Sequence, residues 1–169
     1  MNILLLAKKF SSNFFIFSDN AIRWSSYYGH TDVVKLLLAD GRVDPTANNN
    51  MAIRMSSLHG QTDVVRLLLA DGRADPTTSN NWAILLSSSN GYTGVVQLFL
   101  ADGRADPTAD DNYTIHQSSR NGHIEVVKLL LEDGRADPTA DDNYAIKISS
   151  EKGHADVGQL LLQDPRVKR

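Results

Sequence analysis

The sequence contains no cysteine, which excludes a disulfide framework, a cysteine-ligated metal site and a thiol nucleophile. It also has no apolar run close to the roughly 20 residues that a membrane-spanning helix needs. Near the N-terminus the apolar stretch from Ile3 to Ala7 is interrupted by Lys8 and Lys9, and no small-residue cleavage site follows. We therefore expect no membrane association and an intracellular protein, cytoplasmic or nuclear.

An excess of positive charge is missing as well. The net charge of −3 at pH 7 lacks the basic surplus that nucleic-acid phosphates require, so nucleic acid is not expected as a partner. The phosphate loop GxxxxGK[ST], the dinucleotide turn GxGxxG and the nucleophile motif GxSxG are all absent. An enzyme is therefore disfavoured, and no cofactor is expected.

What the sequence does contain is an internal repeat with a period of 31 residues. The pair Ala21-Ile22 returns at this spacing as Ala52-Ile53, Ala83-Ile84, Thr114-Ile115 and Ala145-Ile146. A glycine marks one further phase, at Gly29, Gly60, Gly91, Gly122 and Gly153. We predict five repeats, over residues 19–49, 50–80, 81–111, 112–142 and 143–169. In the preceding segment, 1–18, the run LLLA at 4–7 echoes LLLA at 36–39, and we interpret it as a remnant half-repeat.

Each repeat is predicted to fold as two short helices and a turn-rich connector. In the last repeat Asn143 is expected to cap the first helix, and Gly153 to supply its left-handed exit. The second helix is apolar nearly all round, as in Val126 to Leu131, so it must pack between neighbours. The connector DGRADPTADDN is rich in turn-forming residues. Such pairs bury their apolar sides only by stacking, which predicts an all-α solenoid of antiparallel helix pairs.

These residues resemble the ankyrin repeat, whose period is about 33 residues. The stretch GHIEVVKLLL at 122–131 is similar to that family's second helix, and the likeness recurs five times over residues 19–167. The first half departs from the family pattern, since TPLH is replaced by YAIK at 144–147 and the connector is about two residues shorter. The style of the repeat is similar to arrays in large DNA viruses and some protists. The resemblance implies an ankyrin-repeat solenoid that binds a protein partner.

Three recurring polar features have structural explanations. His30, His123 and His154 share one phase about a repeat apart, and the resemblance implies that this position hydrogen-bonds the backbone at the turn, so no metal site is expected. Serine pairs such as Ser25-Ser26 supply small residues where first helices approach each other. The recurrent DGRAD turn is interpreted as a structural device and not as a calcium site.

The positions that do not repeat are the candidates for binding. Three phases of the first helix share one face by i, i+3, i+4 spacing, and the resemblance implies that the last two of them line the concave groove that holds protein partners. Arginines flank the aromatic end of this column, and units four and five offer polar groups in place of aromatic ones. The predicted partner-binding residues are Arg23, Trp24, Tyr27, Tyr28, Arg54, Met55, Leu58, His59, Ser89, Asn90, Arg120, Asn121, Glu151 and Lys152.

Several alternatives stay open at this point. The variable face is also explained by neutral drift on a solvated surface. The aromatic residues Trp24, Tyr27 and Tyr28 are equally able to pack against Phe14 to Phe17 in the N-terminal segment. The chain is also consistent with a self-associating or fragmentary array whose uncapped ends contact another copy.

Overall fold

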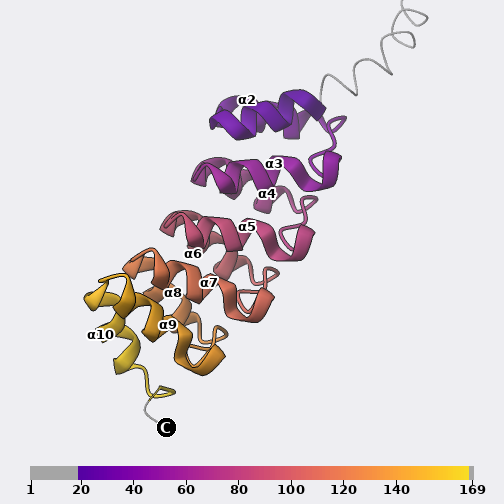
Figure 1. The fold of residues 1–169 in the computed structure, drawn as a ribbon. Coiled ribbons are helices and arrows are strands. Elements are labelled where there is room, and N and C mark those ends of the chain that lie inside the picture. Colours follow the sequence, from indigo (N-terminus) through magenta and orange to yellow (C-terminus); the bar gives the residue numbers. More distant parts are fainter. Residues whose placement is uncertain (1–18, 168–169) are drawn as a thin grey trace, which may run out of the picture. The chain divides into compact units, whose positions relative to one another are not determined.

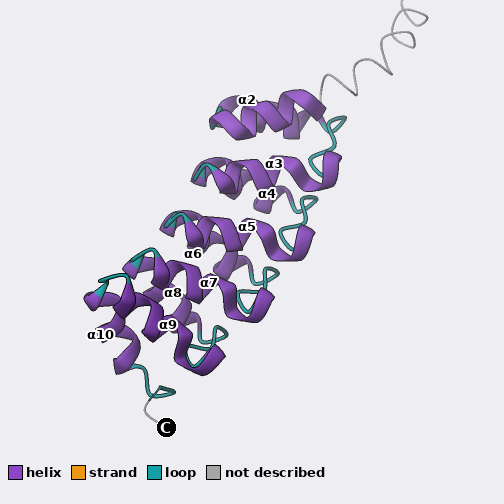
Figure 2. Cartoon of the chain, viewed as in Figure 1, coloured by secondary structure: helices purple, strands orange, loops and turns teal. Residues whose placement is uncertain are grey.

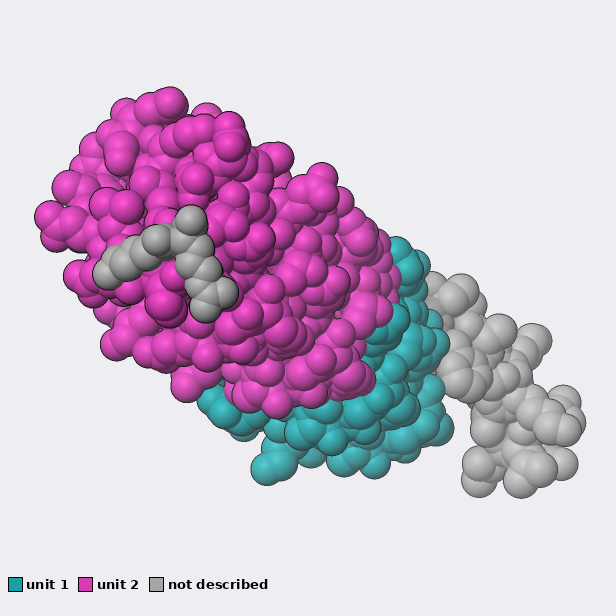
Figure 3. All heavy atoms as spheres, turned by 90° about the horizontal axis from the view of Figure 1, so that it is seen from below, with its two compact units in different colours: residues 1–75 teal, residues 76–169 magenta. Residues whose placement is uncertain are grey.

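The computed structural model describes residues 19–167, and the chain forms two compact units, with unit 1 ending at Asp75 and unit 2 beginning at Pro76 (Figure 3). The predictions made for segment 1–18, including the remnant half-repeat and the packing of Phe14 to Phe17, lie outside the described residues.

Helices and turns make up the whole of the described chain, which contains no strand between residues 19 and 167 (Figure 2). The predicted all-α fold class is confirmed. Unit 1 contains a helix over residues 19–28, followed by α2 (Thr31–Asp40), α3 (Ala47–Leu58) and α4 (Thr62–Asp71). Unit 2 contains α5 (Thr78–Ser89), α6 (Thr93–Asp102), α7 (Ala109–Arg120), α8 (Ile124–Asp133), α9 (Ala140–Glu151) and α10 (Ala155–Gln163).

The helices of unit 2 form two layers (Figure 1). The first helices of successive repeats, α5, α7 and α9, pack in one layer, while the second helices, α6, α8 and α10, pack in the other. Each first helix also contacts the second helix of its own repeat. In unit 1, α3 packs against α4, and α2 packs against α4 in the same way as second helices do in unit 2.

The second helices carry the core. Val126, Val127 and Leu130 of α8 are completely buried, together with Leu161 of α10. As predicted, an apolar helix is enclosed between neighbouring repeats. In the first-helix layer small side chains lie at the helix contacts, since Ser118 and Ser119 of α7 are fully buried and this helix packs between α5 and α9. This burial agrees with the predicted role of the serine pairs as small residues.

The connectors correct one prediction. Where a connector runs into α3, α5, α7 or α9, the second to fourth residues of the helix as bounded above lie in the left-handed region, as at Asp141, Asp142 and Asn143, whose φ angles are 51°, 61° and 63°. Asn143 was predicted to be an N-cap, but that position needs an extended backbone, so this prediction is wrong. Asn and Asp are the residues other than glycine that tolerate left-handed backbone best, which explains why they fill these turns.

At the end of the first helix, the predicted left-handed glycine is confirmed. Gly122 has a φ of 74° and Gly153 a φ of 81°. The sharp turn lets the second helix fold back against the first, and it places the variable end of the first helix at the surface of each repeat.

Candidate functional site

Three aromatic side chains of unit 1 form a cluster on the 19–28 helix. The ring of Trp24 lies 5.6 Å from that of Tyr27 and 6.0 Å from that of Tyr28, and the two tyrosine rings are 4.7 Å apart. Trp24 is 49% exposed and Tyr28 is 60% exposed. The cluster is therefore held together by its own contacts while much of its area faces outward.

The helix places these side chains outward because its opposite face is used for packing. Ile22, Ser25 and Ser26 are buried, and Trp24, Tyr27 and Tyr28 fall between them at i, i+3, i+4 spacing. In α3 the same division holds, since Ile53 is completely buried while Met55 is only partly buried. The two helices are linked directly, because the ring of Tyr27 lies 4.2 Å from the ring of His59.

Between these two helices lies a groove of about 210 Å³, lined by Arg23, Trp24, Tyr27, Met51 and Met55. We call it the unit 1 groove. Apolar side chains form most of its wall, and one guanidinium stands at its edge: the Cζ atom of Arg23 lies 5.0 Å from the centroid of the Trp24 ring, in cation–π geometry.

The predicted set contains four of the five groove-lining residues, namely Arg23, Trp24, Tyr27 and Met55, but it does not contain Met51. Met51 comes directly after the connector asparagine, at a phase occupied by aromatic residues in later repeats. Its position four residues before Met55 was the available signal, because i and i+4 share one face of a helix. The other predicted residues of unit 1, Arg54, Leu58 and His59, lie on α3 or at its end, where His59 is exposed.

The predicted residues of unit 2 are polar and mostly exposed. Asn121 Nδ2 donates a hydrogen bond of 2.8 Å to the Ser89 carbonyl, so these two residues meet across neighbouring repeats. The structure leaves five of the predicted residues in this unit exposed, namely Asn90, Arg120, Asn121, Glu151 and Lys152.

The residue after the turn glycine joins one repeat to the preceding one. Nε2 of His123 lies 2.9 Å from the Ser89 carbonyl, which confirms the predicted backbone contact for this histidine. In unit 1 a glutamine takes the same place, since Gln61 Nε2 donates to the Tyr27 carbonyl at 3.2 Å. This bond anchors the end of the helix that carries the aromatic cluster.

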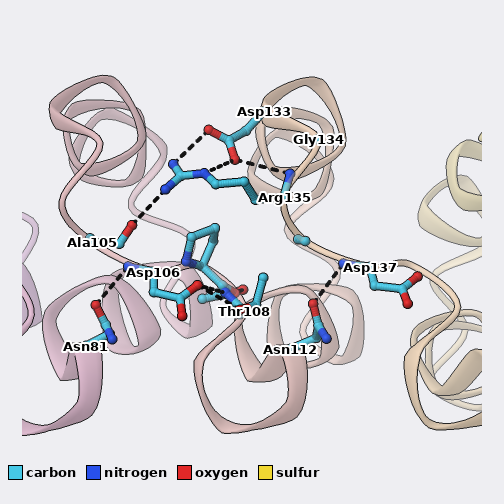
Figure 4. Close-up of polar contacts among 12 residues, drawn as sticks. Asn81, Ala105, Asp106, Thr108, Asn112, Asp133, Gly134, Arg135 and Asp137 are labelled. Atoms are coloured by element: carbon cyan, nitrogen blue, oxygen red, sulfur yellow. Dashed lines mark hydrogen bonds and ion pairs between the residues drawn. The ribbon is translucent and has the colours of Figure 1, made fainter.

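The DGRAD turns are structural, as predicted. Arg135 holds both carboxylate oxygens of Asp133, at 2.8 and 2.9 Å, and its Nη1 donates to the carbonyl of Ala105 in the preceding connector at 3.0 Å (Figure 4). The hydrogen bond from Arg135 keeps the pKa of Asp133 below its usual value. The same backward bond recurs from Arg73 to the Val43 carbonyl and from Arg166 to the Ala136 carbonyl.

A second bond ties successive connectors together. Asn112 Oδ1 accepts from the backbone amide of Asp137 at 2.7 Å, and Asn81 Oδ1 accepts from that of Asp106 at 2.8 Å (Figure 4). Because their side chains reach the next connector, these asparagines do not cap their own helix.

One histidine of unit 2 is buried. His116 is 6% exposed, its ring lies 4.9 Å from that of Tyr144, and its Nε2 atom has no hydrogen-bond partner. Burial lowers its pKa, since a charged imidazole is costly to desolvate. Between residues 19 and 167, no three histidine, aspartate or glutamate side chains converge in a way that suits a metal ion. No helix in this stretch has the length and apolar character needed to cross a membrane.

The helix pairs and connectors repeat along the chain, whereas the exposed residues of the first helices differ from repeat to repeat. This combination is typical of repeat proteins that serve as interaction modules. Comparison with family models gives the particular family: the ankyrin repeat model matches residues 19–50, and the model of three consecutive ankyrin repeats matches residues 81–169. The chain belongs to the ankyrin-repeat family. Ankyrin repeats are generally protein–protein interaction modules, and proteins built from them are typically not enzymes. A comparison with curated proteins found no match.

Proposed function

We propose that this chain is an adaptor that binds a protein partner through the first-helix face of unit 1. The observation that carries the proposal is the aromatic cluster of Trp24, Tyr27 and Tyr28, in which Trp24 and Tyr28 are exposed and Trp24 and Tyr27 line the unit 1 groove. Aromatic and arginine side chains dominate binding energy at protein interfaces because they bury a large rigid area and keep a polar group for hydrogen bonding.

Two further properties of this face favour a partner over a bare solvated surface. Contiguous apolar area exposed to water is unusual in a monomer and commonly marks an interaction site. Met51 and Met55 add flexible, polarisable side chains that adapt to the shape of a bound surface. The predicted residues of unit 2, Ser89, Asn90, Arg120, Asn121, Glu151 and Lys152, are polar groups of the kind that contribute weakly to an interface.

The test is partner binding by the full chain, using a partner captured from its source cells and then purified. Replacing Tyr28 with alanine should weaken binding by about 1–3 kcal/mol. It should leave thermal unfolding nearly unchanged, because Tyr28 is 60% exposed. Lys152→Ala is the control, and as an exposed charge it should cost under about 1 kcal/mol.

The opposite pattern would contradict the proposal. If Tyr28→Ala lowers the stability of the chain and leaves partner affinity untouched, the aromatic cluster is part of the core. The alternative prediction, that the N-terminal segment covers it, would then be preferred.

Self-association is a second candidate, favoured by the outer side of α2. Val33 is 44% exposed and Leu36 is 72% exposed, whereas the equivalents of Val33 in later repeats, such as Val64 and Val126, are completely buried. A second copy of the chain that covers this side would appear as concentration-dependent sedimentation.

A further inference from the structure

We propose that the unit 1 groove recognises a peptide segment in which an apolar side chain is adjacent to an aspartate or glutamate. This inference rests on the proposed function and gives the chemistry of its partner. The apolar side chain would enter the groove, and the carboxylate would pair with the guanidinium of Arg23.

The groove is small for a ligand pocket, which suits an apolar side chain of a peptide better than a free small molecule. Its volume of about 210 Å³ is below the range of about 300–1,000 Å³ that is usual for small-molecule pockets. The walls are the rings of Trp24 and Tyr27 on one helix and the thioethers of Met51 and Met55 on the other. Leucine, methionine or phenylalanine would be buried against these groups, while an alanine would leave much of the volume unfilled.

The charge at its edge favours an acidic neighbour. The Nε atom of Arg23 is buried without a hydrogen-bond partner, and its guanidinium stacks on Trp24. In contrast, the connector arginines are each held by an aspartate, as in the 2.7 Å pair of Arg73 with Asp71. Asp19 is the one carboxylate within residues 19–28 and α3, and its Oδ1 atom also lacks a hydrogen-bond partner, so this oxygen makes no hydrogen bond to Arg23.

An incoming carboxylate would supply a counter-charge to the guanidinium of Arg23. A guanidinium presents its N–H groups in a planar fork that fits two carboxylate oxygens, and stacking on Trp24 holds the fork in place. A bound lysine would meet an unbalanced positive charge instead. The groove would therefore select the apolar side chain of the peptide by its volume and the neighbouring acidic residue by its charge.

The experiment uses the full chain, immobilised and exposed to a phage-displayed library of random 12-residue peptides. We expect the enriched sequences to carry a leucine, methionine or phenylalanine beside an aspartate or glutamate. One enriched peptide is then synthesised together with its acid-to-amide form, Glu→Gln or Asp→Asn. Both are titrated against the Trp82→Phe variant, in which Trp24 is the remaining tryptophan reporter.

The acidic peptide should bind about tenfold more tightly than its amide form, as expected for a charge-assisted pair. Adding Arg23→Gln should reduce that preference to below about twofold, since the paired cation is gone. The matched control is Arg66→Gln, which removes an exposed arginine that pairs with Asp63 on α4 outside the groove and should keep the tenfold preference. Met55→Ala should weaken both peptides equally. Circular dichroism and thermal unfolding verify that each variant is folded.

Each failure has its own meaning. Enriched peptides without an acidic residue, or an acid preference that survives Arg23→Gln, would overturn the inference while the proposed function stands. A concentration-dependent dimer that Met55→Ala dissociates would also overturn it, because the occupant of the groove would be a second copy. The proposed function itself fails only if Tyr28→Ala leaves affinity for the captured protein partner unchanged.

Discussion

Two glycines of unit 2 share a left-handed backbone but differ in their surroundings. Gly122 has a φ of +74°, and a Cβ atom added there would lie 2.5 Å from Nδ1 of His154 in the next repeat. Gly134 has a φ of +80°, and an added Cβ would meet no atom within 4 Å. The first glycine therefore serves both the turn and the fit of the following repeat, whereas the second serves the turn alone.

We expect Gly134→Ala to lower the free energy of unfolding by about 1–2 kcal/mol, the cost of left-handed backbone for alanine. Gly122→Ala should cost more, because it must also displace His154. Urea unfolding of both variants measures the difference, and in a His154→Ala background the cost of Gly122→Ala should fall to that of Gly134→Ala. Equal costs in the unaltered background would show that the histidine contact is unimportant.

His116 gives the chain a pH dependence of known sign. Burial lowers its folded pKa below the ordinary 6.5, and the nearby carboxylates of Asp141, Asp111 and Asp137 offset this only in part. As the pH falls below 6.5, the unfolded chain takes up a proton that the folded chain resists. Stability is thus fully present above that pH and is lost as the pH falls from there toward the folded pKa.

His116→Leu should remove this contribution. Leucine is the residue at the equivalent position one repeat earlier, where Leu85 is also 6% exposed. Unfolding in urea between pH 8 and pH 5 should show a steeper loss of stability for the unaltered chain than for His116→Leu. Parallel profiles would show that His116 titrates alike in the folded and unfolded chain. The other histidines are common to both proteins and cancel in the comparison.

At the scale of the element, the connector is held by bonds that run backward and forward along the stack. Arg135 reaches back to Ala105, whose side chain is completely buried, and Asn112 reaches forward to the amide of Asp137. These bonds satisfy backbone groups that a shortened connector would otherwise leave without partners.

Arg135→Ala should therefore cost about 1–2 kcal/mol of unfolding free energy, since it removes a charge-assisted bond to a backbone carbonyl as well as the fork on Asp133. Arg66→Ala is the matched control: its pair with Asp63 is exposed, spans 3.7 Å and lies within one helix. Such a pair contributes only about 0.2–0.5 kcal/mol. Thermal or urea unfolding measures the stability lost in each variant. If Arg135→Ala is no less stable than Arg66→Ala, Arg135 does not stabilise the connector.

At the scale of the molecule, the surface of α2 is notable because it exposes two apolar side chains, Val33 and Leu36. Val33 is 44% exposed, whereas the residues at the same phase of α4, α6, α8 and α10 are completely buried, as at Val64. If self-association uses this side, Val33→Glu should shift sedimentation toward the monomer, because a charge would have to be buried at the contact.

Gln97→Glu, a change of equal charge at an exposed position of α6, is the control and should leave sedimentation unaltered. A chain that sediments as a monomer at all concentrations before either change would contradict self-association through this surface.

The period of 31 residues by itself determined the fold class, because a helix pair of this length cannot bury its apolar second helix except by stacking on its copies. The sequence also predicts that Trp24, Tyr27 and Tyr28 share one face of the first helix, because residues at i, i+3 and i+4 lie on the same side of a helix. The left-handed glycines followed from the same pattern.

Only the tertiary structure decided what the connector residues contact. Asn143 looked like an N-cap because its type suits that role, but the backbone of its turn is left-handed, and the equivalent Asn112 bonds an amide 25 residues ahead. Met51 lines the groove with Met55 because two helices from different repeats approach there. Contacts between repeats depend on the rotation and distance from one repeat to the next, and no local spacing along the chain carries that information.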